Sequence, residues 1–498
     1  MTVIRKIIFL DNKNSSIRAF VLIAILGLLT VFLIGYLSVD QTPRVYIFII
    51  SAIAIIMAMA FFLRNINIAI PVLIILLPIT NIAFILKIIS SRDPLTIITL
   101  IDIFTVAAII CLLLYKSAAK GGTTVVLKKK SGPGYLSLLL FVLVAFGMLS
   151  VMWSPNIIYG LNYCIRLILN CLLYLLLVIL LKNQSDIVRA IRTYIVISVI
   201  TAITMLFSTL PLGSISKEYY LADGLTMTVD FITYQTRAKS FGYGESHFGP
   251  YILNFGILFA IGLLSQSKRK SEKMLMLVII CFLFWADLYS KARGPIASLL
   301  LAMIFLVFTI KDFRICFLRN FCVIAGCFIF LFGIFKVTSS YIMDYNKRFL
   351  PPVPIQGEHS LNDRFEMWGK AYNAIENNNA YIYGLGAGGG TYYVFPEATT
   401  HNIVLSIFWD FGLIGFILFF ILMFIYITKL SLAIKNLKED FAKAMLLSTS
   451  GCIIAFGLTS ILDSNYNVNM LWFIMGLSTA IYRYAVSTSK ESLSNTIN

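Results

Sequence analysis

A series of long apolar segments restricts the fold of this chain more than any other feature of its sequence. A helix that crosses a bilayer needs about 20 predominantly apolar residues, and successive windows supply about fourteen such segments. They lie at residues 18–39, 44–63, 66–86, 95–115, 135–152, 159–181, 190–210, 246–264, 274–290, 295–311, 320–338, 401–427, 444–463 and 470–486. With 59% hydrophobic and 13% charged residues, the sequence predicts an all-α polytopic membrane protein with about 14 transmembrane helices.

The basic residues predict the orientation of the chain. Cytoplasmic loops retain Lys and Arg, and most of the 40 Lys and Arg residues fall in the terminal segments and in alternate loops, such as 116–132 and 265–273. We therefore expect both termini in the cytoplasm, with the first apolar segment as an uncleaved anchor. The same loops account for much of the net charge of +17, so no nucleic-acid partner is expected.

Two long outer loops divide the chain into five predicted parts. These are the N-terminal spans (1–210), a first long loop (211–245), further spans (246–338), a larger loop (339–400) and the C-terminal spans (401–498). The other outer loops are short, so a function on the outer face is expected to use the two long ones.

The larger loop is predicted to contain a short amphipathic helix on the membrane surface. Its expected apolar face, at helical spacing, consists of Phe365, Trp368, Tyr372 and Ile375. The stretch YGLGAGGGTYY follows and formally matches a dinucleotide-binding glycine pattern. That fingerprint requires a preceding strand, so a flexible turn, or a backbone that approaches a substrate closely, is the preferred interpretation.

His401 and Asn402 stand at the start of the apolar segment 401–427. Spacings of four and three residues from His401 define one stripe of Leu405, Phe408, Gly412 and Gly415. Small residues mark close helix packing in membranes, so His401 is expected to point into the bundle, where an imidazole suits a general base. A helix-capping or core role is the alternative. Asp410 lies on roughly the opposite face, more than two turns into the segment, with no partner evident in the sequence.

Cationic side chains gather at the same predicted depth. Arg166 lies about two turns inside the outer end of its span, and Lys291 and Arg293 occupy a short outer turn. Arg237 and Glu245 lie in the first long outer loop, before the eighth predicted span at 246–264. Arginine suits phosphate geometry, so the group indicates an anionic ligand. Each arginine singly could instead snorkel to lipid headgroups or form a structural ion pair, but a charge inside a membrane segment is a site hypothesis by default.

No metal or other cofactor is expected. The outer loops contain no D-x-D or paired acidic motif, and no His-Glu cluster has metal-ligand spacing. All eight cysteines fall in apolar segments or near their cytoplasmic ends, so neither a disulfide framework nor a thiolate metal site is predicted.

Four stretches of the second half occur in the order RAKSFGYGESHFGPYI, LYSKARGPIASLLLA, NDRFEMWGKAYNAIENNNAYIYGLGAGGG and THNIVLSIFWDFGLIGF. Together they resemble the O-antigen ligase and Wzy-type polymerase superfamily of bacterial membrane glycosyltransferases. The last stretch is the most specific, being similar to a His-Asn, Leu, acidic-x-Gly-x-x-Gly pattern. The chain departs from the family at Glu245 to His247, where an Asn-Pro-Asn-like segment is common, and the first six spans match only in hydropathy.

The resemblance implies a helical membrane fold of the GT-C type in the bacterial inner membrane, with an active site that faces the periplasm. It implies the polymerisation of undecaprenyl-diphosphate-linked oligosaccharide repeat units, which serve as donor and acceptor, and a chain-length regulator as partner. His401 would be the base, Arg293 and Arg237 would hold the diphosphate, and Arg364 would also bind substrate. The candidate binding set is completed by Arg166, Glu245, Asn402 and Lys291.

Two other functions remain open. An O-antigen ligase would transfer the finished lipid-linked glycan to lipid A-core. A flippase or transporter would show repeat symmetry and polar residues near the bilayer midplane on broken helices. The sequence has no clear halves, although Pro71 and Pro78 interrupt the third span.

Overall fold

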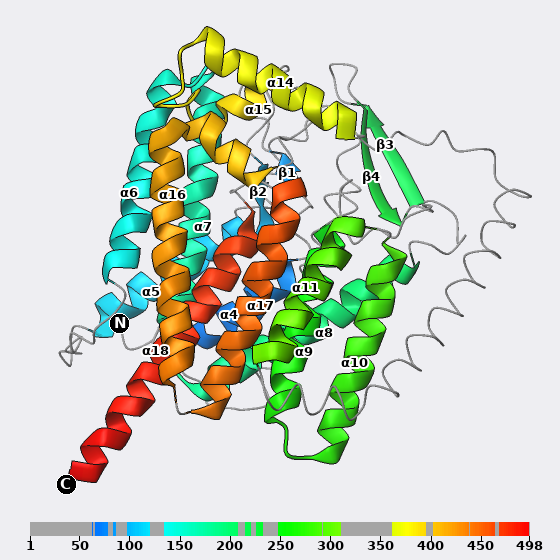
Figure 1. The fold of residues 1–498 in the computed structure, drawn as a ribbon, viewed down its shortest axis with the longest axis vertical. Helices are drawn as coiled ribbons and strands as arrows, with labels where there is room; N and C mark the ends of the chain where they lie inside the picture. The colour runs from blue at the N-terminus through cyan, green and yellow to red at the C-terminus, as the bar shows by residue number, and fades with distance from the viewer. Residues whose placement is uncertain are drawn as a thin grey trace, which may run out of the picture.

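Helices make up most of the structure, a computed structural model that describes residues 62, 65–77, 83–85, 97–119, 134–207, 215–220, 226–232, 248–290, 292–309, 361–394, 402–437, 439–463 and 468–497. The bundle (Figure 1) contains α4 (Ala69–Leu76), α5 (Leu100–Ala119), α6 (Gly134–Ser150), α7 (Ile157–Leu180), α8 (Gln184–Phe207), α9 (Phe248–Gln266), α10 (Lys270–Tyr289), α11 (Arg293–Thr309), α16 (Ile403–Asn436), α17 (Asp440–Asp463) and α18 (Asn469–Ile497). Two 3-10 turns, η1 (Ile66–Ile68) and η3 (Val151–Trp153), precede α4 and α7.

The two ends of the bundle differ. At the upper end in Figure 1 lie α14 (Leu361–Asn377) and α15 (Gly389–Val394). The lower end carries the short turns that join α7 to α8, α9 to α10 and α16 to α17. The upper ends of α9, α10 and α11 stop at a lower level than those of α6 and α7 (Figure 1).

Six of the described helices are long and apolar enough to cross a membrane, namely α7, α8, α9, α10, α16 and α17. Shorter apolar helices occupy Ile66–Leu76, Phe104–Leu114, Leu138–Trp153 and Gly294–Thr309. The chain is therefore a multi-pass helical membrane protein, as predicted. The predicted spans 18–39 and 320–338, and all of 44–63 except residue 62, lie outside the described residues.

The prediction of one continuous span at 66–86 is wrong. The helix α4 has only 8 residues, and β1 (Ala83–Ile85) pairs antiparallel with β2 (Ile97–Thr99). The β-branched isoleucines of both strands favour extended structure. For the same reason α5 begins at Leu100 and not at residue 95.

A second antiparallel pair lies in the predicted outer loop 211–245. It joins β3 (Ile215–Tyr220) to β4 (Thr226–Ile232), with Ser216 opposite Asp230 and Tyr220 opposite Thr226. The connecting sequence contains Asp-Gly at residues 223–224, a dipeptide typical of hairpin turns. The prediction of an all-α fold is correct for the bundle, but it missed the two antiparallel strand pairs.

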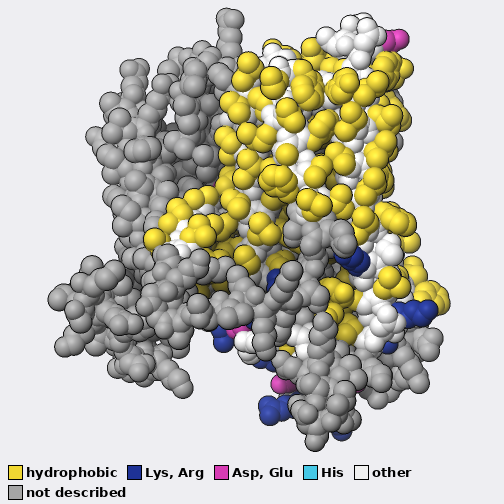
Figure 2. Space-filling model, turned by 90° about the vertical axis from the view of Figure 1, so that its left-hand side faces the viewer, with side chains coloured by type: hydrophobic (Ala, Val, Ile, Leu, Met, Phe, Trp, Pro, Cys, Tyr) yellow, Lys and Arg dark blue, Asp and Glu magenta, His cyan; other side chains and the backbone are white. Residues whose placement is uncertain are grey.

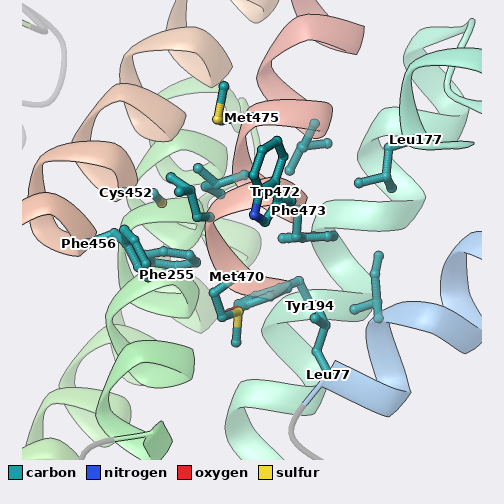
Figure 3. Close-up of a cluster of buried hydrophobic side chains, with 14 of the residues drawn as sticks. Leu77, Leu177, Tyr194, Phe255, Cys452, Phe456, Met470, Trp472, Phe473 and Met475 are labelled. Carbon is teal, nitrogen blue, oxygen red and sulfur yellow. The ribbon is translucent and has the colours of Figure 1, made fainter. Parts of the chain in front are cut away.

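Aromatic and aliphatic side chains fill the centre of the bundle (Figure 3). Tyr194 of α8 stacks on Phe473 of α18 with ring centroids 5.4 Å apart, and its edge meets Phe259 of α9 at 5.2 Å. The hydroxyl of Tyr194 reaches the sulfur of Met470. The first turn of α18 is therefore held between α8 and α9 in the middle of the bundle.

One face of the bundle is a broad hydrophobic wall, with Lys and Arg gathered below it (Figure 2). Large apolar side chains such as Phe141 of α6 (69% exposed) and Phe424 of α16 (72% exposed) lie on the surface of the bundle, which is expected of a surface covered by lipid. The lower turns carry Lys182, Lys268, Arg269 and Lys435. This is the end predicted to be cytoplasmic.

Candidate functional site

The upper end is organised around a break in α16. This helix has 34 residues, and Gly412 inside it has φ 62° and ψ −161°. A straight helix of that length would measure about 51 Å, well beyond a hydrocarbon core of about 30 Å. The break divides it into an oblique upper piece, 403–411, and a long piece that descends beside α6 (Figure 1).

The glycine loop, residues 378–388, supplies the hydrogen bonds that the break removes. In a continuous helix the amide of Leu413 would donate to the carbonyl of Trp409. Here Leu413 N donates to Tyr381 O at 2.9 Å, and Trp409 O accepts from Leu385 N at 2.7 Å. Ile414 N donates to Ile382 O at 3.2 Å. The broken backbone is therefore satisfied inside the protein, as it must be within a membrane.

Asp410 has a partner that the sequence did not reveal. It is 2% exposed, and its Oδ1 accepts a hydrogen bond from Gly390 N at 2.9 Å. A hydrogen bond also joins α7 to α15, because the hydroxyl of Tyr163 donates to the hydroxyl of Thr391 at 3.0 Å. Asp410 lies about two turns into α16, close to the predicted depth, but the helix breaks at Gly412, two residues after it.

The glycines of the loop make close backbone contacts within the protein. Gly384, Gly386 and Gly388 all have positive φ, between 69° and 87°. A Cβ on Gly386 would lie 2.5 Å from the Cα of Ser154, and a Cβ on Gly388 would lie 2.8 Å from the ring of Tyr163. The backbone of the loop approaches η3, α7 and α16 of the protein itself, and its approach to a substrate stays a prediction. The loop has no strand before it, so the nucleotide pattern lacks its required context.

The helix α14 is present where it was predicted, with a different buried face. Met367, Ala371 and Ile375 are buried against Trp409, whereas Phe365 and Tyr372 are 60% and 48% exposed. Of the predicted stripe, Ile375 and partly Trp368 pack within the protein, and contact of Phe365 and Tyr372 with the membrane surface stays a prediction. Tyr372 also hydrogen-bonds the phenol of Tyr381, which is the main reason that the pKa of Tyr381 is raised.

Asn402 caps the oblique piece of α16. Its Oδ1 accepts from Val404 N at 2.9 Å and from Leu405 N at 3.0 Å, as expected of a helix N-cap. This bonding accounts for Asn402 without a substrate, and its binding role stays a prediction. The stripe counted from His401 does not continue as one helical face, because the helix breaks at Gly412.

The other predicted site residues are only partly placed. Arg293 is the first residue of α11, and Arg364 lies in the first turn of α14. The backbones of these two residues are described, but their side chains are not. The remaining predicted residues, which lie outside the described residues, are Arg237, Glu245, Lys291 and His401. The roles of all six stay predictions.

Arg166 lies on α7 about 14 Å from its upper end, close to the predicted depth. Its Nε is buried and makes no hydrogen bond within the described residues. Its positive charge interacts electrostatically with the hydroxyl group of the nearby Tyr163. An arginine inside a membrane helix with a buried, unsatisfied Nε is expected to bind an anion or a hydrated ligand.

Six side chains with buried, unsatisfied polar atoms lie in the upper part of the bundle; we call them the polar layer. They are Arg166, Asn254, Trp285, Asp287, Ser460 and Asn469. Five of them sit near the upper ends of α9, α10, α17 and α18, and Arg166 lies on α7, which packs against α18. Leaving such a group without a partner costs about 1–3 kcal/mol, so their concentration at one level needs an explanation.

The packing of α18 on α7 sets the level of Asn469. The two helices are parallel, and a Cβ on Gly476 would lie 3.1 Å from the carbonyl of Tyr174. Seven residues back along both helices, Asn469 lies level with Leu167. The first residue of α18 therefore stands beside the turn of α7 that carries Arg166, and neither amide atom of its side chain has a partner among the described residues.

Asp287 lies on the last turn of α10, six residues before Arg293. It is fully buried, and neither carboxyl oxygen makes a hydrogen bond within the described residues. The turn after it is ordered by Ser290, whose hydroxyl donates to Asp287 O at 2.6 Å and accepts from Ala292 N at 3.1 Å. The sequence prediction used Lys291 and Arg293 of this turn and missed Asp287, although a carboxylate in an apolar run is itself a signal.

Asn254 connects α9 to the start of α11. Its Nδ2 donates to the carbonyl of Pro295 at 3.0 Å, while its Oδ1 has no partner within the described residues. Ser298 bonds Thr459 at 2.6 Å, which joins α11 to α17. These bonds fix the helix that begins with Arg293 against the polar layer. The described residues contain no group of three His, Cys, Asp or Glu side chains able to hold a metal.

Comparisons with known proteins give little about function. No family model matches the chain, and no curated protein matches it. A chain from a solved peptidoglycan synthase complex, described as coordinating polymerization and crosslinking, is similar at 13% identity and a TM-score of 0.36, over 71% of this chain and 98% of that one. A likeness at that level carries no argument about activity, so membership of the O-antigen ligase and polymerase superfamily stays a prediction.

Proposed function

We propose that the protein is a membrane glycosyltransferase of the GT-C type, with about fourteen spans, that polymerises oligosaccharide repeat units carried on undecaprenyl diphosphate. The polar layer is the observation that carries the proposal. Within the described residues it offers the Nε of an arginine, a carboxyl group, one free amide and the free amide oxygen of Asn254, beside the turn that leads into Arg293. Guanidinium groups suit phosphate, and amides and carboxylates suit the hydroxyls of sugars.

The reaction is a transfer between two lipid-linked glycans. An acceptor hydroxyl attacks the anomeric carbon of the donor, its bond to the diphosphate breaks, and the proton passes to a base. His401 is the proposed base, worth about 10²- to 10⁴-fold in rate. Arg293 and Arg237 stabilise the charge on the leaving diphosphate without a metal, and loss of one such group costs on the order of 3 kcal/mol in the barrier.

The test is reconstitution of the full chain in vesicles with a synthetic undecaprenyl-diphosphate-linked repeat unit. The wild-type protein should convert single repeats into a ladder of longer chains. His401→Ala and Arg293→Ala should abolish the ladder, whereas His359→Ala and Arg269→Gln, outside the proposed site, should retain it. Full elongation by His401→Ala at normal protein level would disprove the base assignment.

The glycans attached to lipid A-core in cells that lack the gene distinguish a polymerase from a ligase. If the protein is a polymerase, its loss leaves single repeats attached to lipid A-core. If it is a ligase, no repeats are attached. A flippase would move the labelled lipid-linked repeat across a vesicle membrane without any elongation, and that result would overturn the proposal.

A further inference from the structure

A groove of about 840 Å³ opens on α8, at the end of the molecule opposite the polar layer. It is bounded by α8 and by Ile75 of α4. The side of α8 that lines it includes Gln184, Arg189, Arg192, Val196 and Ile200. Its volume is in the range of a site for a small molecule.

The groove changes from charged to apolar along α8. Gln184 begins the helix at the lower end, and Arg189 and Arg192 follow within the next two to three turns. Val196 and Ile200, which come next on the same side, are 59% and 43% exposed. The distance along the axis from Arg192 to Ile200 is about 12 Å. An occupant must therefore have a polar head at the lower end and a hydrocarbon part that runs toward the membrane interior.

The polar half of the groove carries excess positive charge. Arg189 meets Asp186 at 3.8 Å, and Asp186 also accepts from Asn183 at 3.5 Å. Arg192 forms no ion pair within the part of the chain that the structure describes. Two guanidinium groups against one carboxylate leave a site that suits a phosphate.

We propose that this groove binds an anionic phospholipid, with its phosphate held by Arg189 and Arg192 and an acyl chain lying along Val196 and Ile200. Basic pockets between membrane helices on the cytoplasmic side bind anionic lipid headgroups, and this end carries the basic turns of the bundle (Figure 2). The site is separate from the proposed reaction, because Arg166 and Asp287 lie toward the other end of their helices. A water-soluble partner would not reach the apolar half of the groove, which lies at membrane depth.

The experiment measures lipid retention by the full-length protein. The protein is purified from nanodiscs that contain phosphatidylglycerol and phosphatidylcholine in equal amounts, and bound lipid is counted by native mass spectrometry. We expect phosphatidylglycerol to be retained preferentially. The double variant Arg189→Gln, Arg192→Gln should lower that retention at least about tenfold, because both charge-assisted hydrogen bonds to the lipid phosphate are lost.

The matched control removes two charges from the same end outside the groove. Lys268→Gln with Arg269→Gln, on the turn between α9 and α10, should retain phosphatidylglycerol as the wild type does. An equal loss in this control would show diffuse attraction and would overturn the proposal. So would undiminished retention in the Arg189 and Arg192 double variant.

A second variant tests the apolar half. Val196→Trp with Ile200→Trp fills the groove and leaves both arginines in place, so retention should again fall at least tenfold while the unfolding temperature stays near that of the wild type. Retention unaffected by the tryptophans, together with displacement of the lipid by inorganic phosphate, would show a simple anion site. A wild-type protein that retains no lipid would show that the chain itself, or nothing, fills the groove. Either result would refute the proposal.

Discussion

At the scale of single residues, Gly412 sets the geometry of the upper end. Its φ of 62° with ψ of −161° belongs to a region open essentially to glycine alone. A Cβ there would also collide with Gly384 N and with the carbonyl of Ile382. The position therefore excludes a side chain for two independent reasons, backbone strain and contact with the glycine loop.

Gly412→Ala should lower the free energy of unfolding by at least about 2 kcal/mol, since an unfavourable backbone conformation alone costs about 1–3 kcal/mol. The measurement is thermal unfolding of the purified protein in detergent. Gly457→Ala is the control, because that glycine lies inside α17 with nothing within 4 Å of an added Cβ. The control should be neutral or stabilised by up to about 1 kcal/mol. Equal stability of the two variants would mean that the break is not required.

Asp287 is expected to lower the stability of the fold while it supports the reaction. Its carboxyl group is fully buried without a hydrogen bond in the described residues, so an amide or an apolar side chain of similar size would be less costly to bury. We expect Asp287→Asn to unfold at the same or a higher temperature and to elongate lipid-linked repeats at least tenfold more slowly. Ser290→Ala, which touches only the adjacent turn, should alter stability more than activity. A stable Asp287→Asn variant with full activity would remove Asp287 from the site.

At the scale of elements, α14, the glycine loop, α15 and the upper piece of α16 form one unit. Leu385 and Trp409 belong both to its small core and to its backbone hydrogen bonds. The unit closes on η3, where Ala387 N donates to the hydroxyl of Ser150 at 3.1 Å and Ala387 O accepts from Ser154 at 3.1 Å. Through these contacts it fixes the direction in which Asn402, and the chain before it, enters the bundle.

The sequence predicted local features of this unit and missed its long-range ones. The apolar runs, α14 and the depth of Arg166 follow from residue spacing along one element. The break at Gly412 depends on carbonyls about 30 residues earlier in the chain, at Tyr381 and Ile382, and a helical count cannot detect it. The polar layer likewise depends on several helices that are far apart in the sequence, where Asn254 and Asn469 are isolated polar residues in apolar runs.

Asp410 tests whether this unit positions the site. Asp410→Asn keeps an oxygen that can accept the hydrogen bond from Gly390 N, whereas Asp410→Ala leaves that buried amide unpaired at a cost of about 1–3 kcal/mol. We expect the asparagine variant to retain most of the elongation rate and the alanine variant to lose at least tenfold, with donor affinity little changed. Asp186→Ala, at the lower end, is the control for a lost carboxylate. Equal losses in both Asp410 variants would show that the charge itself is required.

At the scale of the whole molecule, the bundle has two ends of different chemistry separated by a hydrophobic wall (Figure 2). The lower end is basic and carries the groove on α8. The upper end carries the unsatisfied polar groups, the broken helix and α14. The proposed function requires that the upper end face the donor lipid outside the cytoplasm, and the basic lower turns favour that orientation.

Site-directed labelling of intact cells decides the orientation. In a background without the eight native cysteines, Asn373→Cys on α14 and Lys268→Cys on the turn between α9 and α10 place one thiol at each end of the molecule. A membrane-impermeant maleimide should label the first after the outer envelope is permeabilised, and the second only after the inner membrane is also broken. The opposite pattern would place the polar layer on the cytoplasmic side, where a diphosphate-linked repeat unit exported for polymerisation could not reach it, and the proposed function would then fail together with the predicted topology.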